Sequence, residues 1–181
     1  MNLYIADTHF GHQNAIAFDR RPFADVREMD EVMIRLWNGR VQPEDDVWVL
    51  GDFCFRNEQS PVYYLRQLRG KKHLIVGNHD GKLLQDKQAM SFFETVDQIR
   101  QVTDGEYRIV LCHFPLAEWT RSRHGTLHVY GHIHTTKDET YAYMAGRYPD
   151  QAFNAGCMIN NYTPVSLQEL RENNKRFLGC P

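Results

Sequence analysis

Five short apolar runs in this chain each end at a residue that can bind a metal ion. The runs consist of four or five residues rich in Leu, Ile and Val, the composition of buried β-strands. They are residues 3–6 before Asp7, 47–51 before Asp52, 74–77 before Asn78, 109–112 before His113, and 127–131 before His132. If these strands lie side by side, the residues just past their ends share one edge of a sheet, where open α/β folds bind ligands. The pattern therefore predicts one site built from residues spread over most of the chain.

Helix signals lie between and after these runs, as capping residues at the start and glycines past the end. The predicted helices cover residues 25–38, capped by Asp25 with Glu28 and followed by Gly39; 60–69, begun by Ser60-Pro61 and stopped by Gly70; 82–93; and a segment from Ser166, where Glu169 completes a capping box. Strands alternate with helices through this order. The alternation predicts a single α/β domain over residues 1–181.

The second half adds a hairpin and one weaker strand. Asp104-Gly105 stands between residues 96–102 and 107–112 and is a strong two-residue turn signal. We expect two antiparallel strands there, leading into the His113 loop. A further strand is predicted near residues 152–158, within a stretch whose pattern is otherwise weak.

Bulk composition excludes several classes of protein. At 181 residues and 42% hydrophobic content the chain can form one full core, and a net charge of −2 disfavours binding to long nucleic acid. No apolar stretch approaches the ~20 residues that span a bilayer, and residues 1–4 do not resemble a signal peptide. Four widely spaced cysteines, Cys54, Cys112, Cys157 and Cys180, form no C-x-x-C pair. We expect a cytoplasmic protein with no membrane partner, and the sequence specifies no oligomeric state.

The candidate metal ligands are two carboxylates, one amide and four imidazoles: Asp7, His9, Asp52, Asn78, His113, His132 and His134. This mixture suits Mn²⁺, Fe²⁺ or Zn²⁺. Seven ligands are too many for one tetrahedral ion and contain too few carboxylates for a calcium site. Two divalent cations ~3.5 Å apart repel by roughly 19 kcal/mol at an effective dielectric near 20, so a pair of ions needs an anionic bridge. Asp52 and a hydroxide can provide it.

Local spacing supports convergence of these ligands. In an extended backbone alternate side chains point the same way, so Asp7 with His9, and His132 with His134, can each reach one cluster. A glycine directly precedes three of the ligands, where the missing Cβ permits a tight turn and close backbone approach. These glycines are Gly51, Gly77 and Gly131.

Taken in order, Asp7-x-His9, Gly51-Asp52, Gly77-Asn78-His79-Asp80, His113 and Gly131-His132-x-His134 resemble the signature of the calcineurin-like metallophosphoesterase superfamily, in its small single-domain, bacterial-type phosphodiesterase branch. The resemblance implies two packed mixed β-sheets flanked by helices, an α/β/β/α sandwich. It also implies one metal held by Asp7, His9, Asp52 and His134, and a second held by Asp52, Asn78, His113 and His132. Asp52 would bridge the two ions.

The resemblance further implies a reaction. A metal-bridging hydroxide would attack phosphorus in line, and His79 would be the catalytic general acid that protonates the leaving oxygen. Two divalent ions would be the cofactors, with Mn²⁺ favoured and Fe, Zn or Ni also compatible. The Asn78-His79-Asp80 form favours a phosphodiester over a monoester, within a small phosphorylated substrate. Asp80 could orient His79, but we favour a role as cap of the following helix.

Three residues are candidates for substrate binding: Asn78, Arg56 and His12. Arg56 follows Asp52 by four positions, where protein Ser/Thr phosphatases of the superfamily carry a phosphate-binding arginine. Its neighbours Phe55 and Asn57 depart from that motif, which disfavours protein phosphatase activity and makes a solvated Arg56 slightly the better interpretation. His12 can contact substrate or simply shape its loop.

Other polar and aromatic residues have both a structural and a functional interpretation. For His73, His124 and His128 we favour a structural or surface role. Arg20-Arg21-Pro22-Phe23 and residues 119–123, which begin with Trp119, are either walls of a substrate site or ordinary packing and surface residues.

Two other functions are compatible with the same residues. One is a catalytically silent scaffold of the same fold, which the presence of His79 disfavours. The other is a nuclease that acts on nucleic acid ends, which the mild negative charge disfavours.

Overall fold

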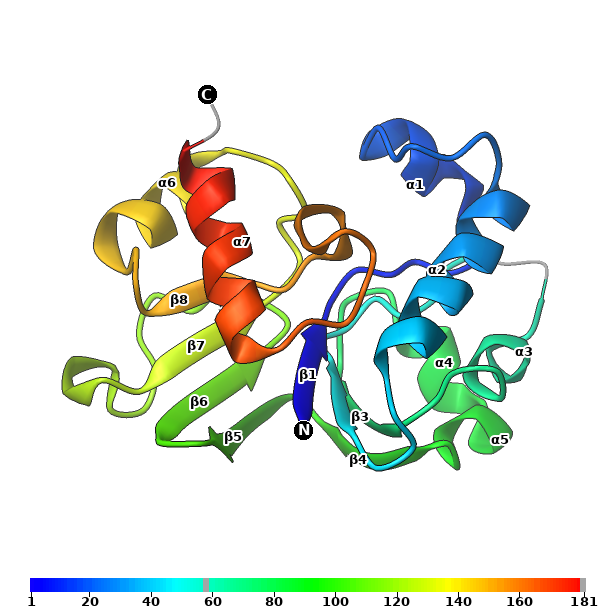
Figure 1. Ribbon diagram of the computed structural model, residues 1–181, viewed down its shortest axis with the longest axis horizontal. Coiled ribbons are helices and arrows are strands. Elements are labelled where there is room, and N and C mark those ends of the chain that lie inside the picture. The colour runs from blue at the N-terminus through cyan, green and yellow to red at the C-terminus, as the bar shows by residue number, and fades with distance from the viewer. Residues whose placement is uncertain (57–58, 180–181) are drawn as a thin grey trace.

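The computed structural model describes residues 1–56 and 59–179. Asn57 and Cys180, which entered the sequence argument, lie outside the described residues. Two four-stranded sheets pack face to face, with helices on both outer faces (Figure 1). This arrangement confirms the predicted α/β class and its sandwich of layers.

The two sheets differ in strand direction. The first is parallel throughout, in the order β1 (Asn2–Ile5), β2 (Asp46–Val49), β3 (Lys71–Ile75) and β4 (Phe93–Asp97). The second is mixed, in the order β5 (Ile99–Asp104), β6 (Tyr107–Cys112), β7 (Leu127–Tyr130) and β8 (Ala152–Asn154), and only the β5–β6 pair is antiparallel. The five apolar runs of the sequence are thus strands β1, β2, β3, β6 and β7.

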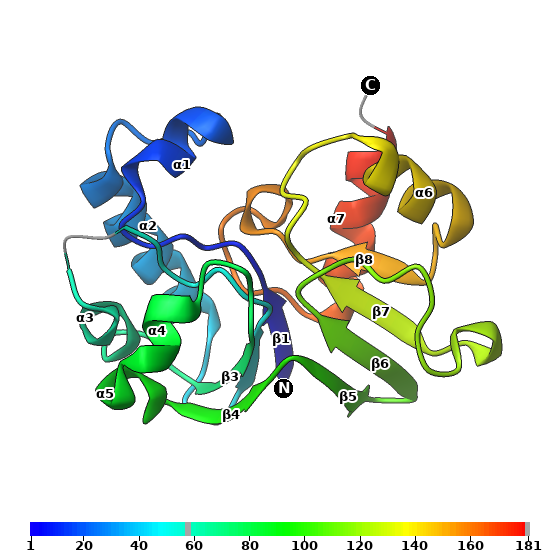
Figure 2. The same cartoon turned by 180° about the vertical axis from the view of Figure 1, so that it is seen from behind.

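Helices cover the outside of both sheets. Those beside the first sheet are α1 (Gln13–Phe18), α2 (Val26–Arg40), α3 (Pro61–Leu65), α4 (Gly81–Gln85) and α5 (Lys87–Met90), and Figure 2 shows α3, α4 and α5 gathered at one end. The second sheet is covered by α6 (Glu139–Arg147) and α7 (Leu167–Gly179). Two 3₁₀ turns, η1 (Ser122–His124) and η2 (Cys157–Asn160), complete the described elements. Within the described part of the chain, no helix is long and apolar enough to cross a membrane.

The core has one layer between the sheets and another beneath the first group of helices. Tyr4 and Leu50 of the first sheet pack with Leu111, Val129 and Phe153 from the second. On the other face of the first sheet, α2 contributes three fully buried side chains, Met29, Met33 and Trp37. Complete burial of an apolar side chain of this size contributes about 1.5–3 kcal/mol to stability. The first layer holds the two sheets against each other, and the second holds α2 against the first sheet.

Both predicted capping motifs that involve a carboxylate are present. Asp25 accepts a hydrogen bond from the Glu28 N–H at 2.8 Å, and the Ser166 N–H donates to the Glu169 carboxylate at 2.8 Å. The helix after Asp25 does not stop before Gly39, however. It runs to Arg40, because the Val41 N–H still bonds to the Trp37 carbonyl.

Three other predicted boundaries are wrong. The helix expected over residues 82–93 divides at Asp86, whose side chain accepts the N–H groups of Gln88 and Ala89 and begins a second helix. The strand expected over residues 96–102 divides at Gln98, because the chain leaves β3 there and crosses to pair with β6 in the other sheet. The helix after Ser60 ends at Leu65, and no hydrogen bond from the Ser60 side chain caps it.

The hairpin itself is present, with its register one residue later than predicted. Asp104 pairs with Tyr107, so the two loop residues are Gly105 and Glu106. Gly105 has φ of +58°, the left-handed conformation that glycine adopts without steric cost. The strand expected near residues 152–158 is also shorter, because β8 ends at Asn154 and a 3₁₀ turn follows.

Candidate functional site

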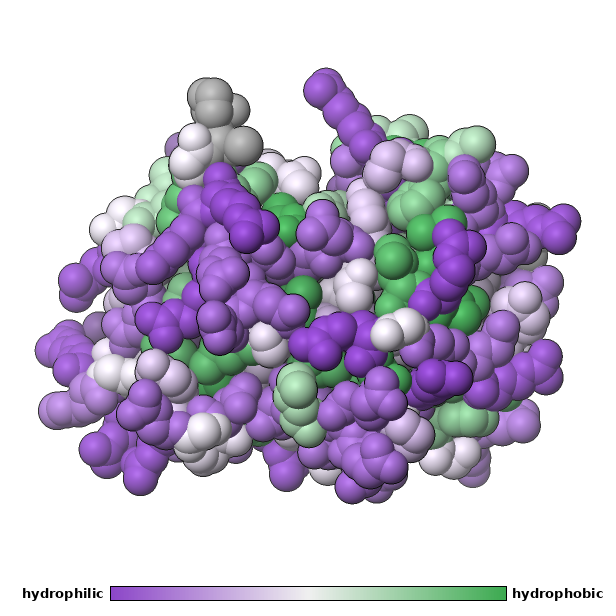
Figure 3. Space-filling model, in the orientation of Figure 1, coloured by the Kyte–Doolittle hydropathy of each residue, from purple (hydrophilic) through white to green (hydrophobic). Residues whose placement is uncertain are grey.

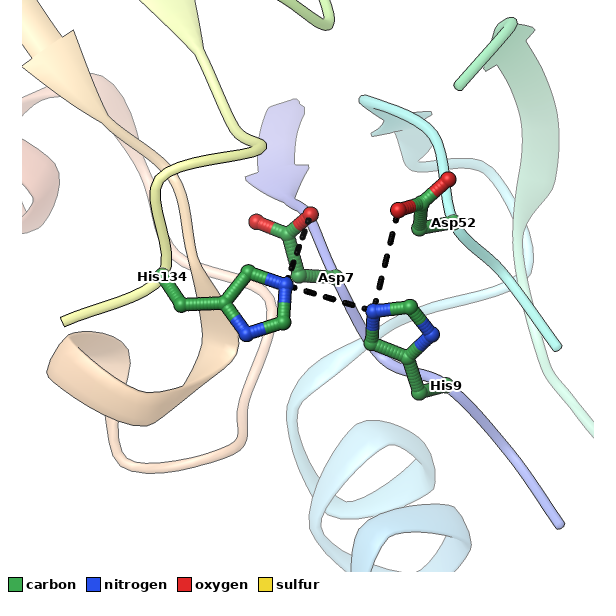
Figure 4. Close-up of side chains that lie close together, drawn as sticks. All are labelled: Asp7, His9, Asp52 and His134. Carbon is green, nitrogen blue, oxygen red and sulfur yellow. Dashed lines mark hydrogen bonds and ion pairs between the residues drawn. The ribbon is translucent and has the colours of Figure 1, made fainter. Parts of the chain in front are cut away.

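Four of the predicted ligands lie together beyond the ends of β1, β2 and β7. The ligand atoms of Asp7, His9, Asp52 and His134 all lie within 4.8 Å of one another, and the four side chains point toward a common centre (Figure 4). The two imidazole Nε2 atoms, of His9 and His134, are 3.3 Å apart. We call these four residues the first ligand group.

The other predicted ligands form a second ligand group, consisting of Asn78, His113 and His132. The Asn78 Oδ1 atom lies 3.0 Å from His113 Nε2 and 2.9 Å from His132 Nδ1. Asp52 joins the two groups, because its Oδ2 atom lies 3.7 Å from His9 Nε2 and 3.6 Å from His113 Nε2. One carboxylate oxygen therefore occupies the position that a bridge between two cations requires.

Hydrogen bonds on the far sides of two imidazoles test whether the site fits cations. His113 Nδ1 lies 2.8 Å from the Leu50 carbonyl, and His134 Nδ1 lies 2.7 Å from the Asp19 carboxylate. Both partners accept, so in the neutral rings Nδ1 carries the proton and Nε2 presents a lone pair. Those lone pairs face the oxygens of Asn78, Asp52 and Asp7, which are also acceptors. The nitrogen and oxygen lone pairs thus face one another with no hydrogen atom between them, and a cation placed there would interact favourably with all of them.

Burial shifts two members of the first ligand group, Asp7 and His9, toward their neutral forms. It raises the pKa of Asp7 to about 6 and lowers the pKa of His9 to about 2. Burial also acts to lower the pKa of His134, but the hydrogen bond to Asp19 and the charge of Asp7 outweigh it and raise that pKa. A neutral imidazole is the form that binds metal, and a cation would favour the ionised form of Asp7.

The ligand loops have an unusual backbone. Five of the ten described non-glycine residues with positive φ are predicted ligands: Asp7, His9, Asp52, His132 and His134, with φ between +48° and +70°. The expectation that Asp7-x-His9 and His132-x-His134 are extended is therefore wrong. Left-handed kinks aim these side chains, and each kink costs of order 1–2 kcal/mol that the surrounding structure must offset.

Two of the glycines before the ligands are required by close backbone approach, as predicted. A Cβ on Gly51 would lie 2.6 Å from the Gly77 Cα, and a Cβ on Gly77 would lie 2.6 Å from the Asp52 backbone nitrogen. The loops after β2 and β3 thus touch through their glycines. This contact brings Asp52 and Asn78 into one site.

Asp80 does not cap the following helix, so that expectation is wrong. Its fully buried carboxylate accepts three backbone N–H groups, from Asp52 at 3.0 Å, Phe53 at 3.0 Å and Gly77 at 2.7 Å. A carboxylate so placed stabilises the two ligand loops together, because each of these N–H groups would otherwise be buried without a partner.

A second supporting network was not predicted. Asp19, whose carboxylate bonds His134, also pairs with Arg21 at 2.8 Å. The buried Arg21 guanidinium donates to the carbonyls of Asp7 at 2.9 Å and Thr8 at 2.8 Å. Arg21 is therefore a structural support behind the first ligand group, and not a wall of the substrate site. No sequence motif marks it, since Asp19 and Arg21 act through the tertiary structure.

His79 lies at the edge of the site. Its N–H donates to Asp52 Oδ1 at 2.8 Å, and its ring, which is half-buried, packs against Phe55 with the ring centres 4.3 Å apart. His12 lies on the same side, with its ring 5.6 Å from that of His9. Arg56 is exposed and its guanidinium lies over the Phe55 ring at 5.2 Å.

The structural interpretations of other residues agree with the contacts. Trp119 is buried against His128 and Tyr148. His128 is fully buried, with Nδ1 bonded to the Val110 carbonyl and Nε2 accepting the Leu116 N–H. His73 stacks on Trp48 far from the ligand groups, and His124 is exposed.

Comparisons with known proteins find relatives along most of the chain and one named enzyme along half of it. No protein-family model matches the chain. It is 30% identical over 165 residues to the uncharacterized protein MJ1445 of Methanocaldococcus jannaschii, covering 90% of this chain and 85% of that protein. The solved structure of AQ665 from Aquifex aeolicus, a protein of unknown function, matches with a TM-score of 0.72 and 25% identity, over 95% of this chain and 98% of that one. A symmetrical bis(5′-nucleosyl)-tetraphosphatase of Glaesserella parasuis is 29% identical over 97 residues, which is 52% of this chain and 34% of that protein.

Proposed function

We propose that the chain is a member of the calcineurin-like metallophosphoesterase superfamily that hydrolyses phosphoester bonds, and that it is a phosphodiesterase with two divalent metal ions. Mn²⁺ is the favoured cofactor, and the substrate is a small phosphorylated molecule. The observation that carries this proposal is the position of Asp52 Oδ2. It lies 3.7 Å from His9 Nε2 in the first ligand group and 3.6 Å from His113 Nε2 in the second.

The first ligand group would hold one ion, and the second, with Asp52, the other. When bound, such ions supply an activated water nucleophile and positive charge for the phosphate oxygens. Asn78 and His132 are the exposed ligands, so the substrate phosphate would approach from the second group. Asp80 and Arg21 would keep the ligand loops in place as charge develops, because both are buried and bonded to the backbone of those loops.

His79 would act as the general acid. Its backbone bond to Asp52 fixes it beside the bridging carboxylate, and its imidazole would give a proton to the leaving oxygen as the P–O bond breaks. Protonation matters most when the leaving group is an alkoxide, as in an alkyl diester. Monoesters and diesters share this need, so the proposal of a diester rests on the resemblance of Gly77-Asn78-His79-Asp80 to the small phosphodiesterase branch.

Hydrolysis of two model esters tests the proposal. Metal-stripped protein reloaded with Mn²⁺ is assayed on bis(p-nitrophenyl) phosphate and on p-nitrophenyl phosphate, beside Asp52→Asn and His79→Ala. Metal-dependent cleavage of the diester that falls by at least 10²-fold in Asp52→Asn is expected. For His79→Ala a fall of this size is expected on an alkyl diester such as dTpdT, whose leaving alkoxide needs a proton. An exposed control, His124→Ala, should retain the wild-type rate.

The other outcomes separate the rival functions. Two bound metals with no turnover of either ester would favour a scaffold. Salt-sensitive cleavage of single-stranded DNA, abolished by His79→Ala with the metal content retained, would favour a nuclease. We also propose a reducing, cytoplasmic location, which the three described free cysteines, Cys54, Cys112 and Cys157, support.

A further inference from the structure

A cavity of about 330 Å³ has His79 in its wall. The loop after β2, the start of α3 and the helix α4 form its walls, and these elements lie together at one end of the first sheet (Figure 2). Among the described residues that line it, His79 belongs to the candidate site and none is a predicted metal ligand. His79 thus belongs both to the wall of this cavity and to the candidate site, where its N–H bonds to Asp52.

The cavity has two cationic side chains in its wall, Arg56 and Lys82. Within residues 1–56 and 59–179, neither forms an ion pair with a carboxylate. Asp86 also lines the cavity, but its Oδ1 atom already accepts two backbone N–H groups, from Gln88 and Ala89. Among the described lining residues, the two cations Arg56 and Lys82 therefore face one carboxylate, a net charge of +1 that favours an anionic occupant.

Beside the polar Gln59 and Ser60, the rest of the lining is apolar. Cys54 and Leu83 are buried, Pro61 lies at the start of α3, and the Phe55 ring extends between His79 and Arg56. An occupant can therefore place a carbon framework, such as a sugar, against this surface. Its anionic group would then lie at the two cations.

We propose that this cavity binds the leaving group of the substrate, and that this leaving alcohol carries a second phosphate held by Arg56 and Lys82. The inference rests on the proposed function, in which His79 protonates the leaving oxygen. The part of the substrate that extends past His79 into this cavity is then the leaving group. The substrate class is a phosphodiester with a further phosphate on its leaving-group side.

Three dinucleotides with the same scissile bond test this assignment: dTpdT, its 5′-phosphorylated form and its 3′-phosphorylated form. A charge-assisted hydrogen bond to phosphate favours one phosphorylated form over dTpdT by about tenfold or more in kcat/KM. Lys82→Met and Arg56→Met should each reduce this ratio toward one. Two matched controls should retain the ratio: Lys87→Met, on the next helix, and Arg66→Met, whose guanidinium also lies over an aromatic ring.

Equal kcat/KM for all three dinucleotides would overturn the assignment, while cleavage of bis(p-nitrophenyl) phosphate would leave the proposed function intact. A second readout does not need turnover. Metal-stripped protein is titrated with inorganic pyrophosphate by calorimetry, and binding should weaken at least tenfold in Lys82→Met and Arg56→Met. If pyrophosphate does not bind, or binds equally well to both variants, the cavity holds no anion site and the inference is refuted. This conclusion does not depend on whether the protein hydrolyses any ester.

Discussion

At the scale of single residues, the carboxylate of Asp19 acts directly on a proposed ligand, His134, although it does not belong to the motif. Its bond of 2.7 Å to His134 Nδ1 fixes the tautomer in which Nε2 faces the first ligand group. Partners of this kind also make an imidazole a better electron donor to a metal. Asp19 is thus a positioning residue for the proposed metal site.

Substitution of Asp19 by Asn should weaken Mn²⁺ binding about 10- to 100-fold, because the charge that orients and polarises His134 is lost. Calorimetric titration of metal-stripped protein measures the affinity. Asp46→Asn is a matched control, since Asp46 bonds the His73 Nε2 at 3.0 Å away from the site. Equal affinities in wild type and Asp19→Asn would show that Asp19 has no positioning role.

His128 gives a pH-dependence that is independent of the metal site. Burial lowers its pKa to about 4 in the folded protein, below the value near 6.5 of an exposed histidine. The unfolded chain therefore binds the proton first, and the free energy of unfolding falls as the pH drops from 6.5 to 4. The loss is about 1.4 kcal/mol for each pH unit and about 3 kcal/mol in all.

Chemical denaturation across this pH range checks the effect. The slope of unfolding free energy against pH should be smaller in His128→Gln, which cannot titrate, than in wild type. Exposed His124→Gln should keep the wild-type slope. Identical slopes in wild type and His128→Gln would contradict the assignment.

At the scale of elements, the loops after β2 and β3 are fitted to each other. The contact between Gly51 and Gly77, and the three N–H groups held by Asp80, bring the bridging Asp52 beside Asn78. Strand order alone would bring the loops only to neighbouring positions. The final approach depends on missing Cβ atoms and one buried carboxylate.

A methyl group on Gly77 should disrupt this fit. It would collide with the backbone of Asp52, so Gly77→Ala should lower the free energy of unfolding by about 1–3 kcal/mol and reduce metal content. Gly81→Ala is the control, because a Cβ there has open space and lies at the start of α4. Thermal unfolding and metal analysis of both variants test this prediction. If Gly77→Ala has the stability and metal content of wild type, the predicted collision with Asp52 does not occur.

At the scale of the whole molecule, the site lies across two sheets. Asp7, Asp52 and Asn78 follow strands of the first sheet, and His113 and His132 follow strands of the second. The apolar layer between the sheets packs the strands that lead into both sets of loops against each other. The surface seen in Figure 3 is mostly hydrophilic, so the apolar residues are used chiefly inside the molecule.

Removal of metal should therefore lower the stability and leave the fold intact. Ions that bind only the folded chain add about 4 kcal/mol at a concentration a thousandfold above Kd. Mn²⁺ should raise the thermal midpoint of wild type and fail to do so in Asp52→Asn, while far-UV circular dichroism of the stripped protein stays native. Loss of that native spectrum on chelation would mean that the metals, and not the apolar layer, hold the sheets together.

The sequence by itself determined the five strands that precede the candidate ligands, and the resemblance implied the sandwich of layers. The expectation that these strands share one edge of a single sheet is wrong, because β1, β2 and β3 lie in the first sheet and β6 and β7 in the second. A strand is recognised from the length and composition of an apolar run, which are properties of neighbouring residues. Each of these runs ends at a polar residue that can be identified in the sequence. The capping of two helices by Asp25 and Ser166 was readable for the same reason.

Only the tertiary structure decided how the chain divides and what supports the site. Residues 93–104 are one extended stretch in sequence, yet they split between sheets because β3 and β6 offer separate edges for pairing. The role of Asp80, the network of Asp19 and Arg21, and the left-handed ligands depend on groups distant in sequence, which no local pattern encodes. Hydrogen bonds and close contacts form only once the two sheets have packed, so these features belong to the folded molecule.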